Sequence, residues 1–305
     1  MAKNTQNHKL ENVFIVGSPR SGKTLLQSLL AFHPEFGWFS QYYSRCRFLP
    51  AVGALNRIYD IPGIGKFLAA RDRKFFLPRP VEMAKDYNCK LASAGVLTGN
   101  EVKEKDKKKL REVFEAQLKI QKKDKFLTDY GRPARMLYFK KIFPSAKFIH
   151  VLRDGRNVTA DFLKERPEWF NKNRDISAYY NNPPENLKKK LMQHKGTSNY
   201  TMVLAALRWK MAIMELEKQS KKLVEKDYLI VKYEDLIHDK FGVVEKCLKF
   251  LHLEPANMLN NVVSARKFYH ENIWESYFNF KTKNILNDLL GDILVKYNYV
   301  EENKE

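Results

Sequence analysis

Short apolar runs alternate with amphipathic stretches along most of the chain. Four apolar runs are typical of strands that are buried on both faces: residues 13–16, 125–130 and 146–154, and the run DYLIVKYEDL. Four stretches have apolar residues at helical spacing: residues 23–32, 105–123 and 202–226, and the run FGVVEKCLKFLHL. On the third helix, the inward face is expected to carry Leu204, Leu207, Met211 and Met214. Strands and helices in alternation predict an α/β fold in which helices cover both faces of a central parallel sheet.

The length of the chain favours one large domain. With 305 residues, 44% of them hydrophobic, it can bury a single large core, and we expect one α/β domain over residues 1–305. Residues 36–124 begin with an irregular, aromatic stretch that Pro and Gly interrupt. We expect these residues to form a substrate-binding insertion within the domain. The run WFSQYYSRCRF either lines an apolar acceptor pocket there or fills the core.

The charge of the chain is strongly basic. Lys and Arg number 55 against 35 Asp and Glu, a formal net charge of +20. This balance suits a polyanionic ligand or an acidic partner surface. Much of the excess lies in KEKDKKKLR and NLKKKLMQHK, which are typical of exposed helix faces. No base-reading motif accompanies them, so we do not expect a nucleic-acid partner.

The cysteines and the N-terminus indicate where the protein works. Cys46, Cys89 and Cys247 are widely spaced and odd in number, which argues against a disulfide framework and against a metal-ligand cluster. The sequence MAKNTQNHKLEN has no apolar signal core, and no run approaches the ~20 apolar residues that span a bilayer. We therefore expect a soluble, cytoplasmic protein without a membrane span. The oligomeric state cannot be predicted from these features.

The most informative motif joins the first predicted strand to the first predicted helix. Gly17, Gly22, Lys23 and Thr24 complete the pattern G-x-x-x-x-G-K-T. Glycines let backbone N–H groups converge on an anion, and the N-terminus of the following helix adds its dipole. The motif therefore predicts a P-loop-like strand, turn and helix that bind a phosphate or a group resembling it.

The motif does not identify the nucleotide. A kinase or ATPase also needs an acid at the end of a second apolar strand to hold Mg²⁺. The run FIHVL is followed by Arg153, and YLIV is followed by Lys232. Cations at these strand ends suit an additional phosphate better than a metal, so we predict no metal site. A Mg-ATP-dependent P-loop kinase or NTPase remains the alternative.

Four segments, in order, resemble the PAPS-dependent sulfotransferases, and in pattern their bacterial and tyrosylprotein-type branches. They are FIVGSPRSGKTLLQSLLAFHPEF, FPSAKFIHVLRDGRNVTADFL, the set LRWKMAIMELEKQ, DYLIVKYEDLIHD and CLKFLHLEP, and the terminal ILVKYNYVEE. PAPS is 3′-phosphoadenosine-5′-phosphosulfate. The resemblance implies in-line transfer of a sulfuryl group from PAPS, without a metal, to a hydroxyl or amine. The product is PAP, and the acceptor is a small molecule, a glycan or a lipid.

The resemblance also implies a set of site residues. Arg20 and the backbone of residues 21–25 would bind the 5′-phosphosulfate, Arg153 would pair with the 3′-phosphate, and Tyr233 would lie near the adenine or pack in the core. The full set of expected cofactor-binding residues is Ser18, Arg20, Ser21, Gly22, Lys23, Thr24, Leu25, Arg153, Asp161 and Tyr233. Asp154 and Arg156 are expected to stabilise the loop rather than to touch ligand.

Three positions depart from the family pattern. Lys23 replaces a usual Thr, and Asp161 replaces a Ser that binds the 3′-phosphate. Asp129 stands near a usual Lys, and is either a general base or an ordinary solvated or salt-bridged Asp. The catalytic candidates are Arg20, Lys23 and Asp129. These departures leave open a catalytically degenerate protein that only binds nucleotide.

Overall fold

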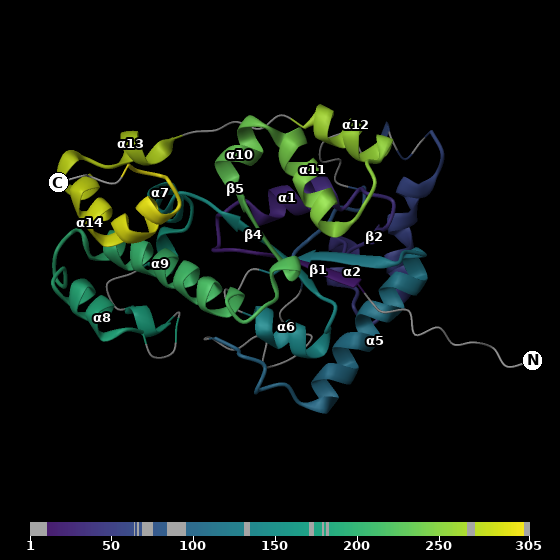
Figure 1. Cartoon of the computed structure of the whole chain (residues 1–305), viewed down its shortest axis with the longest axis horizontal. Helices are drawn as coiled ribbons and strands as arrows, with labels where there is room; N and C mark the ends of the chain where they lie inside the picture. The colour runs from purple at the N-terminus through teal and green to yellow at the C-terminus, as the bar shows by residue number, and fades with distance from the viewer. Residues whose placement is uncertain are drawn as a thin grey trace, which may run out of the picture.

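The computed structural model (Figure 1) describes residues 11–63, 65, 67, 68, 76–83, 96–130, 135–170, 174–178, 180, 183–266 and 272–301. Five parallel strands form a sheet in the order β2-β3-β1-β4-β5. The strands are β1 (Glu11–Val16), β2 (Phe36–Gly37), β3 (Lys125–Asp129), β4 (Lys147–Leu152) and β5 (Tyr228–Lys232). Because β1 is the central strand, the loop that follows it lies between the loops that follow β3 and β4.

Helices connect and cover these strands. The α-helices are α1 (Lys23–Leu30), α2 (Gln41–Arg45), α5 (Glu104–Gln121), α6 (Met136–Ile142), α7 (Gly155–Glu165), α8 (Glu185–Met192), α9 (Tyr200–Ser220), α10 (Tyr233–His238), α11 (Lys240–Leu251), α12 (Asn257–Ala265), α13 (Ile273–Tyr277) and α14 (Phe280–Lys296). The 3₁₀ helices are η1 (Pro50–Asp60), η3 (Pro167–Trp169), η4 (Ile176–Ala178) and η5 (Glu225–Asp227). No helix in the described part of the chain is long and apolar enough to cross a membrane.

Alternate residues of the strands face opposite layers of helices, as the pleat of a sheet requires. Val13 and Ile15 of β1 pack with α1, α11 and α12, which lie on one side of the sheet in Figure 1. Phe14 and Val16 pack on the other side against α5 and α6, where the ring of Phe14 stacks on Phe139 at 4.3 Å between centroids. Helices α7, α8, α9, α13 and α14 enclose a further apolar cluster, at the left of the view. The predicted α/β fold with a covered parallel sheet is confirmed.

The predicted elements differ from the observed ones in three main places. The helix predicted over residues 202–226 ends at Ser220, and the 3₁₀ helix η5 follows it at Glu225–Asp227. The run DYLIVKYEDL is not a strand throughout, because β5 ends at Lys232 and α10 begins at Tyr233. Glu234 and Asp235 lie in the first turn of α10, where negative charge stabilises the end of a helix. Met214 of α9 is 39% exposed and does not face inward. The inward face near that end of α9 is taken instead by Leu216 and by Gln219, whose side chain donates to Leu97 O.

The cysteines agree with the expectation where the structure describes them. Cys46 and Cys247 are free thiols. Burial raises the pKa of the Cys247 thiol to about 12, so this side chain is an inert part of the core. Cys89 lies outside the described residues.

Candidate active site

The glycine-rich loop (residues 17–24) joins β1 to α1 through an unusual backbone. Gly17, Arg20 and Gly22 have φ angles of 152°, 67° and 95°. A Cβ at Gly22 would come within 2.4 Å of the Tyr233 ring, and a Cβ at Gly17 within 2.5 Å of Val151 O. The sequence therefore requires glycine at both positions, for close approach as well as for backbone conformation. Left-handed residues in such a turn, followed by the first N–H groups of α1, form a concave site for an anion.

Lys23 lies inside the glycine-rich loop. Its ammonium donates to Gly17 O at 3.2 Å and to Ser18 O at 2.8 Å, and the side chain is buried. Burial lowers the pKa of Lys23, while the nearby charge of Asp129 opposes this shift. The lysine thus closes the loop from within and brings a positive charge to the place where the loop would hold an anion.

Asp129 ends β3, next to β1, and is joined to the glycine-rich loop. Its Oδ2 accepts a hydrogen bond of 2.8 Å from the Thr24 hydroxyl, and its Oδ1 is buried without a hydrogen-bond partner. Burial raises the pKa of Asp129 to about 6, against the opposing charge of Lys23. An unpartnered carboxylate oxygen with this pKa is suited to accept a proton near neutral pH.

The position of Asp129 corrects one step of the sequence argument. The runs FIHVL and YLIV are followed by Arg153 and Lys232, but the adjacent strand β3 ends in an acid, Asp129. Asp129 is on a strand adjacent to β1 and is bonded to the P-loop threonine. This is the neighbourhood in which P-loop NTPases hold Mg²⁺. In the described chain, no three His, Cys, Asp or Glu side chains gather as a metal site.

Glu82 is a site residue that the sequence argument missed. Its charge raises the pKa of Asp129 and of Lys23, which places its carboxylate near both groups. The neighbouring Met83 N donates to Asp129 O at 3.2 Å, so the backbone of this segment is bonded to the end of β3. Glu82 lies in the irregular region before residue 100, where no motif distinguishes it from any surface acid. Only the tertiary structure could reveal it.

Arg153 follows β4 and is held by a carboxylate on its own segment (residues 153–161, the Arg153 segment). Its Nη1 donates to Asp161 Oδ2 at 2.5 Å and to Arg20 O at 3.0 Å. Arg20 also approaches Asp161, with 3.9 Å between Nη2 and Oδ1. A carboxylate and a bound phosphate repel each other. At Asp161 this repulsion is reduced, because two guanidinium groups approach the carboxylate. The same contacts place an internal anion beside Arg153.

Tyr233 packs between the glycine-rich loop and the Arg153 segment. The guanidinium of Arg153 lies 4.4 Å from the centre of its ring, and the ring covers Gly22. Burial raises the pKa of the Tyr233 phenol, so the side chain is neutral at ordinary pH. The ring thus packs on the protein and also lies beside the glycine-rich loop. Its proximity to an adenine stays a prediction.

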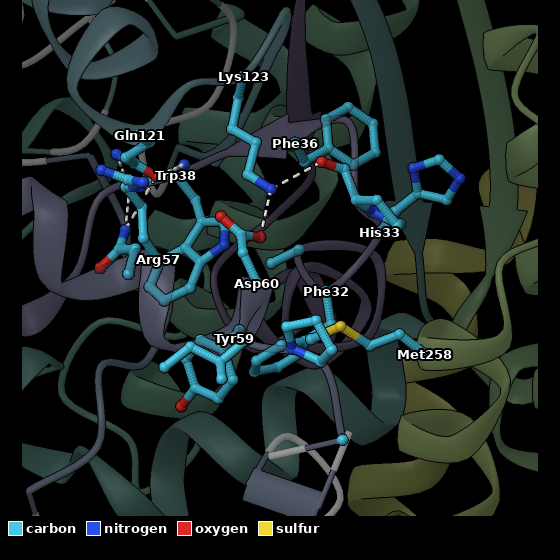
Figure 2. Close-up of a pocket in the computed structure, with 16 residues that line it drawn as sticks. Phe32, His33, Phe36, Trp38, Arg57, Tyr59, Asp60, Gln121, Lys123 and Met258 are labelled. Carbon is cyan, nitrogen blue, oxygen red and sulfur yellow. Dashed lines mark hydrogen bonds and ion pairs between the residues drawn. The ribbon is translucent and has the colours of Figure 1, made fainter. Parts of the chain in front are cut away.

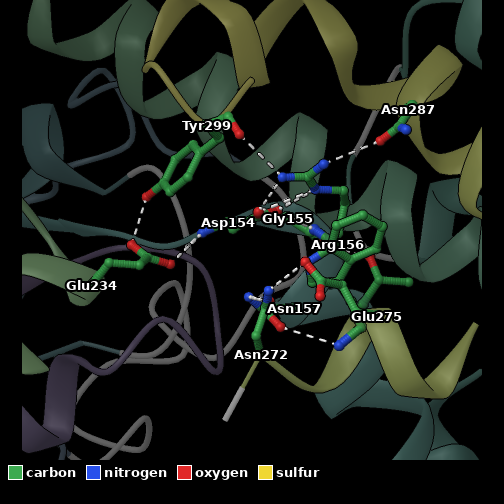
Figure 3. A network of polar contacts seen from close by, with 11 residues as sticks. Asp154, Gly155, Arg156, Asn157, Glu234, Asn272, Glu275, Asn287 and Tyr299 are labelled. Carbon is green, nitrogen blue, oxygen red and sulfur yellow. Dashed lines mark hydrogen bonds and ion pairs between the residues drawn. The ribbon is translucent and has the colours of Figure 1, made fainter. Parts of the chain in front are cut away.

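Other polar side chains fix the Arg153 segment to the rest of the fold (Figure 3). Arg156 pairs with Asp154 through several hydrogen bonds, the shortest 2.7 Å, and donates to Asn287 and to Tyr299 O. Glu234 accepts from Asp154 N and from the Tyr299 hydroxyl. The segment is thereby tied to α10 and to the chain after α14. Asp154 and Arg156 lie in this network, as expected of residues that support a loop.

His33, just after α1, and Ser40 and Gln41, at the start of α2, are engaged in structural contacts. Ser40 Oγ accepts from Tyr43 N at the start of α2, and Gln41 bonds to Leu77 O and Arg79 N. His33 contacts Glu254 O at 2.9 Å, and burial lowers its pKa. Ser40 and Gln41 are therefore neutral side chains with structural contacts, and neither supplies a carboxylate to the glycine-rich loop.

The remaining predicted residues also surround the glycine-rich loop. Ser18 and Ser21 are buried, and Ser21 Oγ has no hydrogen-bond partner. Leu25 is half-buried against the cluster of α1, α11 and α12. Every predicted site residue thus lies at the carboxyl edge of the sheet, because parallel strands bring the loops after β1, β3 and β4 to one edge. The glycine-rich loop with its cations, Arg20 and Lys23, fits the 5′ half of a phosphosulfate nucleotide. Arg153, which is expected to bind the 3′ half, is already bonded to Asp161.

Comparison with known proteins places the chain in a family. The sequence profile of the sulfotransferase family matches residues 12–257. No curated protein sequence matches. Sulfotransferase STF9 from Mycobacterium avium is similar in structure, at a TM-score of 0.56 and 12% identity, over 94% of this chain and 77% of that one. Sulfotransferase STF1 from Mycobacterium tuberculosis H37Rv has a TM-score of 0.52 and 10% identity, over 92% of this chain and 77% of that one. The sulfotransferase domain from the curacin biosynthetic pathway has a TM-score of 0.50 and 13% identity, over 93% of this chain and 97% of that one. At these identities the structures support the fold, and the profile match supports the family: the chain belongs to the sulfotransferase family and is a sulfotransferase.

Proposed function

We propose that this protein transfers a sulfuryl group from PAPS to a hydroxyl or amine group of an acceptor molecule. The observation that carries the proposal is the hydrogen bond of 3.0 Å from Arg153 Nη1 to Arg20 O. It brings the end of β4 against the glycine-rich loop, so that cations for two separate anionic groups lie side by side. A nucleotide with anionic groups at both its 5′ and 3′ positions matches this pair of cationic segments.

The cations of the glycine-rich loop act on the leaving oxygen. PAPS supplies a sulfuryl group joined to a phosphate, which departs when the acceptor attacks sulfur in line. Lys23 and Arg20 supply positive charge close to the loop that holds this phosphate, and fixed charge stabilises negative charge that develops in the transition state. Burial of Lys23 strengthens its effect, because water screens the charge less.

Asp129 is the proposed general base. Its buried, unpartnered Oδ1 accepts the proton of the acceptor hydroxyl, while Oδ2 is held by Thr24. The pKa of about 6 leaves the carboxylate ionised at neutral pH, yet more basic than an exposed Asp. Residues 36–124, which include Glu82, form the proposed acceptor side of the site. A small molecule, a glycan and a lipid are the acceptor classes that we propose.

The experiment that tests this function is a titration with PAP and with ATP, both in EDTA, by calorimetry. Tight binding of PAP with little binding of ATP is the expected result, and a screen of hydroxyl and amine acceptors with PAPS would follow. Failure to bind PAP, together with binding of ATP that appears only when Mg²⁺ is restored, would overturn the proposal. Such a result would instead favour the second candidate function.

That second candidate is a Mg-ATP-dependent reaction, and the contact between Thr24 and Asp129 is what favours it. The hydroxyl and the carboxylate lie 2.8 Å apart beside the glycine-rich loop. A P-loop hydroxyl and a strand-end carboxylate are the groups that bind Mg²⁺ in kinases and NTPases. The effect of removing Mg²⁺ on PAPS turnover separates the two functions, since the proposed sulfuryl transfer proceeds in EDTA. A protein that binds PAP but transfers to no acceptor would indicate the degenerate alternative.

A further inference from the structure

The 3₁₀ helix η1 (Pro50–Asp60) carries apolar residues on its outer surface. Side chains three positions apart align on a 3₁₀ helix, which has three residues per turn. Gly53, Asn56 and Tyr59 form the buried face of η1. The apolar residues of the neighbouring face, with the flanking residues in line, are Leu49, Val52, Leu55, Ile58 and Ile61, which we call the apolar stripe. Leu49, Leu55 and Ile61 are about half exposed.

In the described chain, exposed large apolar residues are most frequent in the stretch of sequence that contains the apolar stripe. Half of the large hydrophobic residues that are exposed there lie between Phe48 and Phe76. Phe48, next to the stripe, is 87% exposed and projects into solvent. Single exposed apolar residues are ordinary, but a concentration of them marks a surface that binds a partner or a membrane.

Basic residues flank the stripe. Between Gln41 and Gly63 the charged residues are Arg45, Arg47, Arg57 and Asp60. Arg45 and Arg57 are exposed. Asp60 is paired with Lys123 at 2.6 Å, so its negative charge is neutralised locally. The net charge of +20 adds a long-range attraction to any anionic surface.

Behind the stripe, η1 lines a pocket of about 250 Å³ (Figure 2). Phe32, Trp38 and Tyr59 form its aromatic wall, with 4.9 Å between the ring centroids of Phe32 and Tyr59. Ile61 lines the pocket and is also the last residue of the stripe. Apolar surface therefore continues from the outside of η1 inward. The pocket borders the C-terminal end of α1, whereas the glycine-rich loop lies at the N-terminal end.

We propose that the apolar stripe and Phe48 dock this protein on an anionic membrane surface. Leu, Ile and Phe side chains enter the boundary between headgroups and acyl chains, and the flanking arginines contact anionic headgroups. The combination of protruding apolar side chains with the exposed Arg45 and Arg57 matches such a surface in both chemistry and charge. This docking is independent of the identity of the sulfuryl donor.

The test is co-sedimentation of the full chain with vesicles of phosphatidylcholine alone or mixed with phosphatidylglycerol. The protein is expected to sediment with the anionic vesicles, less so as salt is raised, and to stay in solution with phosphatidylcholine. The double variant Phe48→Glu, Leu55→Glu should reduce the partition coefficient at least about tenfold, because two apolar side chains lose their burial. Phe280→Glu is the matched control, since Phe280 is 80% exposed on α14. It adds one negative charge at another surface and should leave binding within about twofold.

Three outcomes would overturn the proposal. The wild-type chain could fail to sediment with anionic vesicles at low salt. The Phe280 variant could lose as much binding as the double variant, which would reduce the effect to net charge. Light scattering could show a dimer that Leu55→Glu dissociates, with no vesicle binding, which would assign the stripe to contact with a second copy. Circular dichroism of each variant separates these outcomes from loss of folding.

Discussion

The glycine-rich loop and the Arg153 segment lie side by side and both carry positive charge, but they hold it differently. In the glycine-rich loop, Lys23 is bonded to the neutral carbonyls of Gly17 and Ser18. In the Arg153 segment, the guanidinium is bonded to the ionised side chain of Asp161. A carbonyl leaves the cation with its full charge, whereas a carboxylate cancels it. An incoming anion therefore meets, at the first segment, a cation that is bonded only to neutral carbonyls, with the carboxylates of Asp129 and Glu82 nearby. At the second segment it meets a cation that is already bonded to a carboxylate.

This difference indicates that the two segments contribute unequally to ligand binding. An anion at Arg153 must share the guanidinium with Asp161 or displace it, and breaking a short, partly buried ion pair offsets part of what the new contact contributes. At the glycine-rich loop, no described hydrogen bond joins the Lys23 ammonium to a carboxylate, although Asp129 and Glu82 lie near it. We infer that the 5′ end of the nucleotide supplies most of the binding free energy, and that the 3′ end is recognised more weakly.

The largest predicted effect concerns Asp129, which is bonded to the glycine-rich loop. Asp129→Asn should lower the transfer rate about 10²-fold or more, because the amide cannot accept the proton. The base works only when ionised, so the wild-type rate should fall as the pH drops through about 6, the pKa that burial gives Asp129. Rates with PAPS and one active acceptor between pH 5 and 8 check this.

Two variants control for that measurement. Glu82→Gln removes a charge that raises the pKa of Asp129, so the fall in rate should move to lower pH. Asp227→Asn alters another buried Asp, paired with Lys140 at 2.5 Å, and should leave the pH profile unchanged. A wild-type acid limb that persists in Asp129→Asn would show that another group is the base.

The next effect tests whether Lys23 acts on the reaction or only closes its loop. Lys23→Met keeps the length of the side chain and removes its charge, and should reduce kcat about 10²-fold if the ammonium stabilises the leaving oxygen. Turnover with saturating PAPS measures this. Lys147→Met is the matched control, because Lys147 also donates to a backbone carbonyl, Phe250 O at 2.7 Å, but from the start of β4. Unchanged turnover in Lys23→Met would remove Lys23 from the mechanism.

The elements around these residues could be predicted from the sequence, because their signals are local. The apolar run before Gly17 and the leucines after Lys23 predicted β1 and α1 to within two residues at each end. The contact between Thr24 and Asp129 joins residues 105 positions apart, and only the strand order reveals it. Glu82 gave no signal, since its segment has no periodic pattern. The pairing of Asp161 with Arg153 could not be predicted either, because the rotamer of an arginine is not encoded locally.

A smaller effect is predicted at Asp161 itself. Asp161→Ser should raise the affinity for PAP about tenfold, because Arg153 no longer has an internal carboxylate to satisfy. Calorimetry with PAP in EDTA measures the change. Asp161→Asn removes the charge at nearly constant size and should give a similar gain. If both variants bind PAP more weakly, Asp161 instead holds Arg153 in a productive position, and the inferred weakness of the 3′ end is wrong.

The smallest effect concerns the scaffold that both segments share. His150 lies on β4 and is paired with Val16 of β1. It is therefore part of the sheet that carries both segments. Burial lowers its pKa to about 3, and its Nδ1 lies 2.7 Å from the Tyr228 hydroxyl. The folded chain therefore keeps His150 neutral, whereas the unfolded chain protonates it below about pH 6.5. The contribution of His150 to the free energy of unfolding is therefore complete above pH 6.5 and is lost as the pH falls toward 3.

His150→Gln should remove this dependence while leaving a hydrogen-bonding side chain opposite Tyr228. Between pH 7.0 and 5.5, the wild-type free energy of unfolding should fall by about 1.4 kcal/mol more than that of the variant, as urea titrations at the two pH values would show. His194→Gln, after α8, should match the wild type. His150 is on β4, which leads into the Arg153 segment, and is paired with Val16 of β1, which leads into the glycine-rich loop. The ratio of PAP to sulfate affinity is therefore expected to stay unchanged in His150→Gln. A changed ratio would mean that the difference between the segments arises in the strands and not in the ion pair of Arg153 with Asp161.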